Sequence, residues 1–346
     1  MAENKHQILL DTLDNKPTDR VLAGFWHHYL SNEQKQVLGY RDLAVIDEVV
    51  NRQQNFYDRY HPDFTKIMSD GFFLHPSVID NEFETPEDLK KIQPIDPDDP
   101  WITRQVAAIK AIVDHYEGEI GSFYNIFSPW YQLRLRFEIL EKDSEKIYRF
   151  LKKEPEAIAD AFDVLSDDLI VLGTKLIKES GIDGIYLCVQ QPQDSLISTK
   201  QWQQYVQPSE VKLLRAVQDI RDYNIIHICG FNGKRNQLGD YKDYPVKAFH
   251  WATYVEEVSL KEGKELFGGR AVMGGFENTE NGVFYKGSKE EIQAETQRLL
   301  EENGHQGILL SGDCSIPFDT DDAHGQWVSE MLTVEAYQRV TGSEKR

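Results

Sequence analysis

The chain is poor in cysteine, with three in 346 residues. Cys188, Cys229 and Cys314 lie far apart, and an odd, widely spaced set predicts no disulfide framework. No apolar run approaches the roughly 18 residues that a membrane-spanning helix needs. The N-terminus also lacks the basic segment and apolar core of a secretory signal. We therefore expect a cytoplasmic protein in a reducing compartment, with no membrane association.

Positive charge is scarce. The chain carries 38 Lys and Arg against 58 Asp and Glu, for a formal net charge of −20. A surface that binds nucleic acid needs clustered Lys and Arg, so we expect no nucleic-acid partner. The net charge does not exclude a small anionic ligand, because a local field can oppose it. A hydrophobic content of 40% and an aromatic content of 11% are typical of a folded globular protein.

No internal repeat or low-complexity linker divides the chain, so we interpret residues 1–346 as a single domain. Eight short, nearly continuous apolar runs are typical of parallel strands that are covered on both faces. These runs are Val21–Trp26, Phe64–Ser69, Glu119–Phe127, Gly184–Val189, Asn224–Cys229, Val246–Ala252, Ala271–Phe276 and Gly307–Ser311.

Longer amphipathic segments separate the apolar runs and predict helices. They are Asp42–Tyr60, Ile102–Tyr116, Pro155–Ser180, Thr199–Tyr223, Lys289–Asn303 and Ala323–Val340, with a further helix over Lys5–Leu13. Ser198 or Thr199 can cap one of them, and Ser288 with Glu291 has the spacing of a capping box. The residues beyond the roughly 250 of a typical (β/α)8 barrel fall mainly in the Lys5–Leu13 helix and in loops around residues 71–100.

Eight strands alternating with helices predict an α/β fold, a (β/α)8 TIM barrel. Residues 1–20 would form an N-terminal helical extension that caps it. The rival fold, an open doubly wound sheet, is disfavoured because no Gly-x-Gly-x-x-Gly follows the first strand.

The strongest chemical signal is His227-Ile228-Cys229 at the end of the fifth predicted strand. Residues i and i+2 of a strand point to the same face, so the imidazole and the thiol are presented together. Cys314 lies at the end of the eighth strand, and one imidazole with two thiolates is a normal Zn²⁺ ligand set that leaves a fourth position open. The alternative is that all three are buried structural residues.

Other candidates also lie at strand ends, where barrel active sites form. Asp70 is a candidate catalytic acid/base, and its alternative role is to cap a turn in Ser69-Asp70-Gly71. The candidate substrate-binding residues are Trp26, Tyr124, Trp130, Trp251 and Glu277. Aromatic side chains of this kind line apolar or cation-binding pockets, and they equally fill barrel layers. Cys188 is interpreted as a core residue.

The chain resembles the uroporphyrinogen decarboxylase superfamily. The resemblance rests on Asn15–Val21 before the first strand, on Gly275, and on Gly287–Ile292 at the next helix start. It extends from about residue 5 to residue 340 and implies a (β/α)8 barrel with an N-terminal helical extension.

Two chemistries are known in that superfamily. The decarboxylases carry arginines directly after the first strand to bind a polycarboxylate, whereas this chain has Phe25–Tyr29 there with no arginine. Corrinoid-dependent methyltransferases bind zinc through His-x-Cys and a distant cysteine, a pattern that His227, Cys229 and Cys314 match.

The resemblance therefore implies a zinc-dependent methyltransferase that moves a methyl group between a corrinoid carrier protein and a small thiol. The substrate would be that thiol or a methylated compound, and the corrinoid would be held by the partner protein. The alternatives are a uroporphyrinogen decarboxylase-type lyase and a non-catalytic barrel that binds a corrinoid or a methylated amine. A homodimer is compatible with the sequence.

Overall fold

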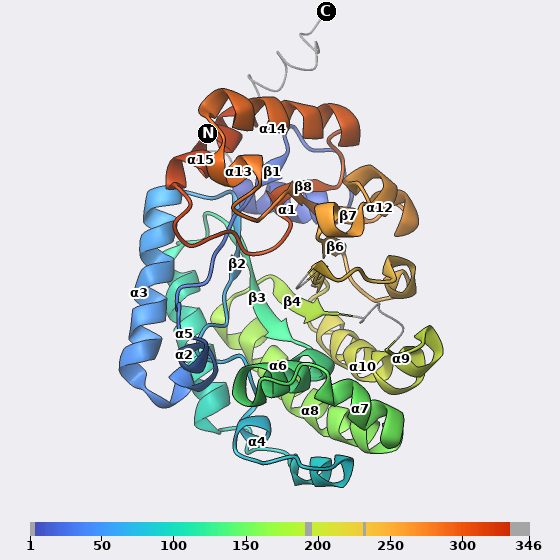
Figure 1. Ribbon diagram of the computed structural model, residues 1–346. Coiled ribbons are helices and arrows are strands. Elements are labelled where there is room, and N and C mark those ends of the chain that lie inside the picture. The colour runs from blue at the N-terminus through green and yellow to red at the C-terminus, as the bar shows by residue number, and fades with distance from the viewer. Residues whose placement is uncertain (1–3, 191–195, 231–232, 333–346) are drawn as a thin grey trace, which may run out of the picture.

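A computed structural model describes residues 4–190, 196–230 and 233–332. Eight parallel strands lie at its centre with helices around them (Figure 1). Their bounds are β1 Leu22–Ala23, β2 Phe64–Ile67, β3 Gly121–Phe127, β4 Gly184–Val189, β5 Ile225–Ile228, β6 Ala248–Trp251, β7 Ala271–Phe276 and β8 Ile308–Gly312. The order β1-β8-β7-β6-β5-β4-β3-β2 is that of a nearly closed α/β TIM barrel, which confirms the predicted fold.

β1 and β2 stand at the two ends of the strand order, and we call the place where they meet the seam. A backbone hydrogen bond and several side-chain contacts hold it together. The backbone N–H of Asp63 donates to the carbonyl of Ala23 across 3.1 Å. The Asp63 carboxylate accepts hydrogen bonds from the Arg20 guanidinium at 3.0 and 2.9 Å and from the Ala23 N–H at 3.1 Å. A side chain at Gly24 would place its Cβ 2.5 Å from the Phe64 carbonyl oxygen, so only glycine permits this approach. β1 is therefore two residues long rather than the six predicted.

Helices cover the outside of the barrel (Figure 1). The structure describes α1 Lys5–Leu13, α2 Glu33–Leu38, α3 Leu43–Tyr60, α4 Pro76–Ile79, α5 Pro100–His115, α6 Pro129–Glu141, α7 Lys146–Lys153, α8 Pro155–Lys175, α9 Thr199–Tyr205, α10 Gln207–Gln218, α11 Thr253–Glu256, α12 Leu260–Leu266, α13 Val283–Lys286, α14 Lys289–Asn303 and α15 Asp322–Met331. Shorter helical turns occupy Gly39–Arg41, Pro86–Lys91, Leu176–Ser180 and Leu238–Tyr241. The predicted capping box at Ser288 begins α14, and Ser198, one of the two predicted caps, begins α9, also with a capping box.

Several predicted helices differ in extent. The helix expected over 199–223 is divided into α9 and α10, because Pro208 lacks the N–H that would continue the first helix into the second. The loop expected over 71–100 contains α4 and a 3-10 turn. Of the helix predicted over 323–340, α15 forms the described part, and residues 333–340 lie outside the described residues.

α1 packs at the N-terminal end of the strands. Leu9 and Leu13 are buried there, and Leu9 contacts the position of Gly121, the first residue of β3. Lys5 pairs with Asp63 at 3.1 Å, and His6 contacts Asp183 at 2.8 Å. The predicted N-terminal helix thus covers the end of the barrel opposite to the strand exits.

Among the helices of the described residues, none combines the length and the hydropathy of a membrane span.

Candidate metal centre

The structure brings together His227, Cys229 and Cys314. His227 lies on β5, Cys229 follows that strand, and Cys314 follows β8. The ligand atoms of these three side chains lie within 4.8 Å of one another. His227 and Cys229 are buried and Cys314 is partly exposed, so the group is accessible from one side. We call these three residues the donor cluster.

The His227 imidazole is the clearest sign that the donor cluster has a ligand. Among the described residues, neither ring nitrogen has a partner at hydrogen-bond geometry, although His227 is only 1% exposed. A buried polar atom without a partner is costly, and in native proteins a bound ion is one of its explanations. An imidazole with two thiols is a normal donor set for Zn²⁺ and too soft for Mg²⁺ or Ca²⁺. The residues present therefore fit a zinc ion.

The two sulfurs of the donor cluster titrate as a pair. A hydrogen bond from Cys229 lowers the pKa of Cys314 well below its ordinary value, and the nearby His227 acts in the same direction. That same interaction raises the pKa of Cys229 well above its ordinary value, with burial adding to the shift. The two shifts have opposite directions, so Cys314 is the sulfur of the pair that loses its proton more readily. The Tyr131 hydroxyl donates a further hydrogen bond to Cys229 Sγ at 3.3 Å.

The rings of Trp26, Tyr186 and His250 lie beside the donor cluster inside the barrel, and we call them the aromatic wall. The Tyr186 ring stacks on His227 with 5.6 Å between ring centroids, and the His250 ring lies 4.5 Å from that of His227. Tyr186 Oη donates to His250 Nδ1, and His250 Nε2 donates to the carbonyl of Gly312 at 2.9 Å. Burial lowers the pKa of His250 well below its ordinary value, so this histidine is neutral.

Cys188 is near the donor cluster but serves another contact. Its Sγ donates to Asn125 Oδ1 at 3.0 Å, and Asn125 Nδ2 donates to Ser69 Oγ at 2.7 Å. Burial raises the pKa of Cys188 to about 12, so the sulfur stays a neutral thiol. These contacts agree with its interpretation as a core residue.

Comparison with known proteins adds the family. The uroporphyrinogen decarboxylase (URO-D) family model matches residues 74–333. The chain belongs to the uroporphyrinogen decarboxylase family. No curated protein sequence matches it significantly.

Solved structures show the shared fold. A methyltransferase from Methanosarcina mazei superposes with a TM-score of 0.67 at 16% identity, covering 94% of this chain and 97% of that chain. A B12-independent methionine synthase from a Shewanella species, in complex with selenomethionine, gives 0.52 at 11% identity, with 93% and 98% covered. A beta-mannanase from the blue mussel Mytilus edulis gives 0.51 at 11% identity, with 90% and 92% covered.

In this family member the Asp70 carboxylate is buried and holds the backbone after β1. Its oxygens accept hydrogen bonds from the backbone N–H groups of Tyr29 and Leu30, and from His28 Nδ1 at 2.8 Å. These contacts favour a role in positioning residues 28–30. The catalytic role of Asp70 stays a prediction.

Of the five predicted substrate-binding residues, Trp26 lies on the aromatic wall. Its ring is 5.9 Å from that of Tyr186 and 5.8 Å from that of His250. Trp130 lies instead on α6, where its ring packs against Tyr148 and Phe162 on neighbouring helices. That position is part of the helical layer and outside the barrel interior.

Tyr124 and Trp251 point to the outer side of the barrel. The Tyr124 hydroxyl donates to Gln105 on α5 at 2.7 Å, and the Trp251 ring occupies the space that a Cβ at Gly263 on α12 would need. Their packing against helices does not support contact with substrate. Glu277 follows β7 and accepts a hydrogen bond from its own loop, from Thr279 Oγ1 at 2.6 Å.

A cavity of about 840 Å³ lies at the exit of β1 and β8. Its lining includes His27, His28, Ser315 and Ile316, so it borders the segment that directly follows Cys314. Phe318 at its edge is 72% exposed. The residues that line it do not include the donor cluster itself, and Ser315 is the lining residue next to Cys314 in the chain.

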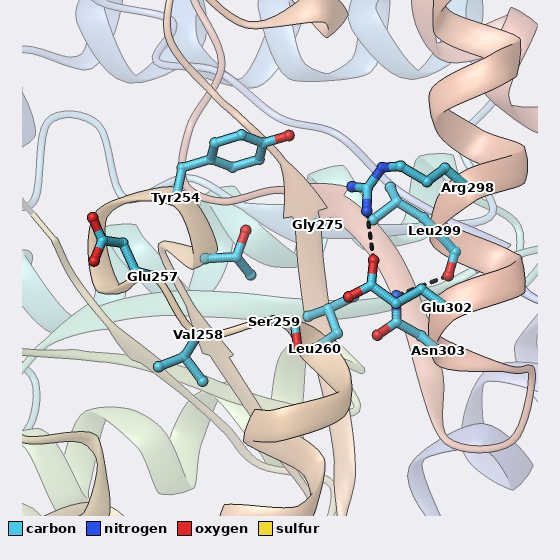
Figure 2. A pocket seen from close by; sticks show the side chains of 11 residues that line it. Tyr254, Glu257, Val258, Ser259, Leu260, Gly275, Arg298, Leu299, Glu302 and Asn303 are labelled. Atoms are coloured by element: carbon cyan, nitrogen blue, oxygen red, sulfur yellow. Dashed lines mark hydrogen bonds and ion pairs between the residues drawn. The ribbon is translucent and has the colours of Figure 1, made fainter.

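A second cavity of about 410 Å³ lies between α12, α14 and the Gly275 end of β7. Figure 2 shows Arg298 beside it, with the guanidinium directed at Glu302 and already paired. The residues that line this cavity include neither the donor cluster nor the residues that directly follow Cys314, so we do not assign the active site to it. Behind Gly275, the buried Asp313 carboxylate accepts from the N–H groups of Tyr254 and Gly275, each at 3.0 Å. Asp313 thereby fixes the start of the loop that carries Cys314.

Sequence reasoning missed Tyr131, Tyr186 and Lys66. The signal for Lys66 was available, because it is the charged residue of β2. Tyr131 gave no signal, since it lies in the first turn of α6 and meets Cys229 only in the folded chain.

Proposed function

We propose that the chain is a zinc-dependent methyltransferase that transfers a methyl group between a corrinoid carrier protein and a small thiol. The observation that carries the proposal is the donor cluster. Its ligand atoms lie within 4.8 Å of one another, and neither His227 nitrogen has a hydrogen-bond partner in the part of the chain that the structure describes. Membership of the uroporphyrinogen decarboxylase family and the structural similarity to a protein named a methyltransferase support it.

His227, Cys229 and Cys314 would hold the zinc through one nitrogen and two sulfurs. Bound zinc supplies a fourth coordination position at which a thiol loses its proton and becomes a nucleophile at neutral pH. The protein's own part is to keep Cys229 and Cys314 in place through Tyr131 and Asp313, and to orient the imidazole against Tyr186. The corrinoid partner would approach through the cavity of about 840 Å³ at the exit of β1 and β8.

The decarboxylase alternative has less support. Its catalytic carboxylate would be Asp70, which already accepts hydrogen bonds from two backbone N–H groups and from His28. The arginines at the cavity, Arg52 and Arg59, are paired with Glu48 and Asp322 and do not form a free cationic surface for a polycarboxylate.

Elemental analysis and methyl transfer test the proposal together. We expect purified protein to contain zinc and to transfer methyl between a methylcorrinoid protein and a small thiol. Cys314→Ser removes one ligand, so zinc content and transfer should both fall sharply. Cys188→Ser is the matched control, because this third cysteine lies outside the donor cluster, and it should keep both.

Two results would contradict the proposal. One is a Cys314→Ser protein with unchanged zinc content and transfer. The other is tight binding of a corrinoid or methylated amine with no transfer in the wild type, which would favour the non-catalytic barrel.

A further inference from the structure

α11 contacts the two segments that carry the cysteines of the donor cluster. This helix, Thr253–Glu256, is a single turn that follows β6, whereas Cys229 follows β5 and Cys314 follows β8. So short a helix has too few hydrogen bonds of its own to be stable in isolation. Its contacts with the rest of the chain therefore hold it in place.

The N-terminal end of α11 is bound to the residue that precedes Cys314. The Thr253 hydroxyl donates to the Asp313 carboxylate, with distances of 2.9 and 2.8 Å to its two oxygens, and the Tyr254 N–H donates to the same group at 3.0 Å. Asp313 is buried, and a buried acceptor that loses a donor is costly. Because Asp313 and Cys314 are adjacent in the chain, α11 fixes the position at which the Cys314 segment begins.

The C-terminal end of α11 is bound to the Cys229 segment through Glu256. The backbone N–H of Asn236 donates to both oxygens of the buried Glu256 carboxylate, at 3.0 and 2.8 Å. The Asn236 side chain joins the same partners, since its Nδ2 donates to Glu256 Oε1 at 2.8 Å and to the carbonyl oxygen of Cys229 at 2.9 Å. Asn236 thus connects Glu256 to the backbone of a cysteine in the donor cluster.

The residue after Cys229 also packs directly on α11. A side chain at Gly230 would place its Cβ 2.9 Å from Ala252 Cβ and 3.0 Å from Val255 Cγ1. A glycine is therefore needed for the backbone to approach the helix this closely. Close packing adds to the hydrogen bonds of Asn236, so the same turn of helix holds both cysteine segments.

We propose that α11 is a clamp that sets the spacing of Cys229 and Cys314 for the metal, with Glu256 and Thr253 as its positioning residues. Glu256 acts through Asn236, and Thr253 acts through Asp313. A metal binds more tightly when its ligands are already in place, because binding then requires no further ordering of the chain. The inference rests on the proposed function, since it takes the donor cluster to be a metal site.

The test compares the metal affinity of full-length single variants. We expect Glu256→Gln and Thr253→Val each to raise the zinc dissociation constant by about tenfold or more, as is typical of groups that support a metal ligand. Competition with a chromophoric chelator measures this constant. The measurements are made at pH 8, because burial raises the pKa of Glu256 to about 7 and its carboxyl is ionised above that value.

Cobalt(II) in place of zinc gives a second measurement. The visible absorption of bound cobalt depends on the geometry of its ligands, so it reports the spacing of the two cysteines directly. We expect the absorption bands of the cobalt-loaded Glu256→Gln and Thr253→Val proteins to differ from those of the wild type.

Two controls separate positioning from a general loss of stability. Glu257→Gln changes the neighbouring glutamate, which is exposed and pairs with Arg235, so the zinc affinity should stay that of the wild type. Asp63→Asn removes a buried carboxylate at the seam and should destabilise the fold without changing the zinc affinity or the cobalt spectrum. Thermal unfolding of each metal-free variant gives the stability with which its affinity is compared.

The outcomes separate the clamp from the metal site. If Glu256→Gln and Thr253→Val bind zinc as tightly as the wild type does, the clamp is wrong and the metal site stands. The clamp is also wrong if Asp63→Asn loses as much zinc affinity at an equal loss of stability. If Glu256→Gln does not fold, the result for Thr253→Val decides. If the wild type binds neither zinc nor cobalt, the proposed function is wrong and the inference falls with it.

Discussion

The Tyr131 hydroxyl donates a hydrogen bond to the sulfur of Cys229 across 3.3 Å. The two residues are separated by 98 positions in the chain and come from α6 and the end of β5. A donor to a cysteine sulfur favours the thiolate form, which is the form that binds a metal, and fixes its orientation. Tyr131 is thus the described neighbour best placed to tune a metal bound at the donor cluster.

Tyr131→Phe should weaken zinc binding. The variant keeps the ring that stacks on Phe127 at 4.9 Å, and it loses only the hydroxyl. Groups that support a metal ligand in this way typically change metal affinity by about 10–100-fold. Competition with a chromophoric chelator measures the change. Tyr205→Phe, which removes a surface hydroxyl near Glu156, is the control, and equal affinities in the two variants would contradict the prediction.

Asp70→Asn should reduce stability and leave zinc content unchanged. The variant keeps one acceptor oxygen, so part of the set of hydrogen bonds to residues 28–30 is lost. We expect a decrease of about 1–3 kcal/mol in the free energy of unfolding, measured in urea. A catalytic Asp70 would also lower kcat by about a hundredfold or more at unchanged KM. Unchanged stability would argue against the positioning role.

Glu210 should make stability depend on pH. Burial raises its pKa from 4.5 to about 7, although its carboxylate accepts a hydrogen bond from Tyr244. The folded state therefore holds this proton more tightly than the unfolded state does. The protonated Glu210 carboxyl therefore contributes to the free energy of unfolding in full below pH 4.5, and this contribution is lost as the pH rises through about 7.

Glu210→Gln should remove that dependence. The amide mimics the neutral carboxyl. The variant and the wild type should therefore have similar free energies of unfolding near pH 4.5, and the two values should diverge at higher pH. At pH 8 the variant should be more stable by about 3 kcal/mol at most. Urea unfolding across this pH range measures the difference, and Glu290→Gln on the exposed surface should follow the wild type. A variant that is less stable at pH 8 would contradict the prediction.

Asp63→Asn should destabilise the seam between β1 and β2. Burial raises the pKa of Asp63, but the stronger combined effect of Arg20, Lys5 and the Ala23 N–H holds it below its ordinary value. Removing this carboxylate takes away the counter-charge of a buried guanidinium, which typically costs about 3–5 kcal/mol.

Urea unfolding at pH 7 checks this value. The difference from wild type should shrink as the pH falls and Asp63 itself is protonated, because a lowered pKa contributes stability that acid removes. Asp19→Asn, at an exposed position one residue before Arg20, should change stability little. A similar loss in both variants would show that the seam does not depend on this ion pair.

The barrel and most of the donor cluster follow from local patterns in the chain. Runs of apolar residues predict strands buried on both faces, and the spacing of His227 and Cys229 places their side chains on one face of a strand. The capping boxes at Ser198 and Ser288 are equally local, because their partners lie three residues away. All these features involve residues only a few positions apart in the chain, so local backbone geometry is enough to define them.

Which side of each strand faces the barrel interior depends on how the whole barrel closes. In a strand that is apolar on both faces, the alternation of side chains does not distinguish inside from outside. The same uncertainty made Trp26 and Trp251 equal candidates, although one lies on the aromatic wall and the other against α12. The position of Lys66 beside Tyr186, and of Tyr131 beside Cys229, likewise depends on strands and helices distant in sequence that meet when the barrel closes.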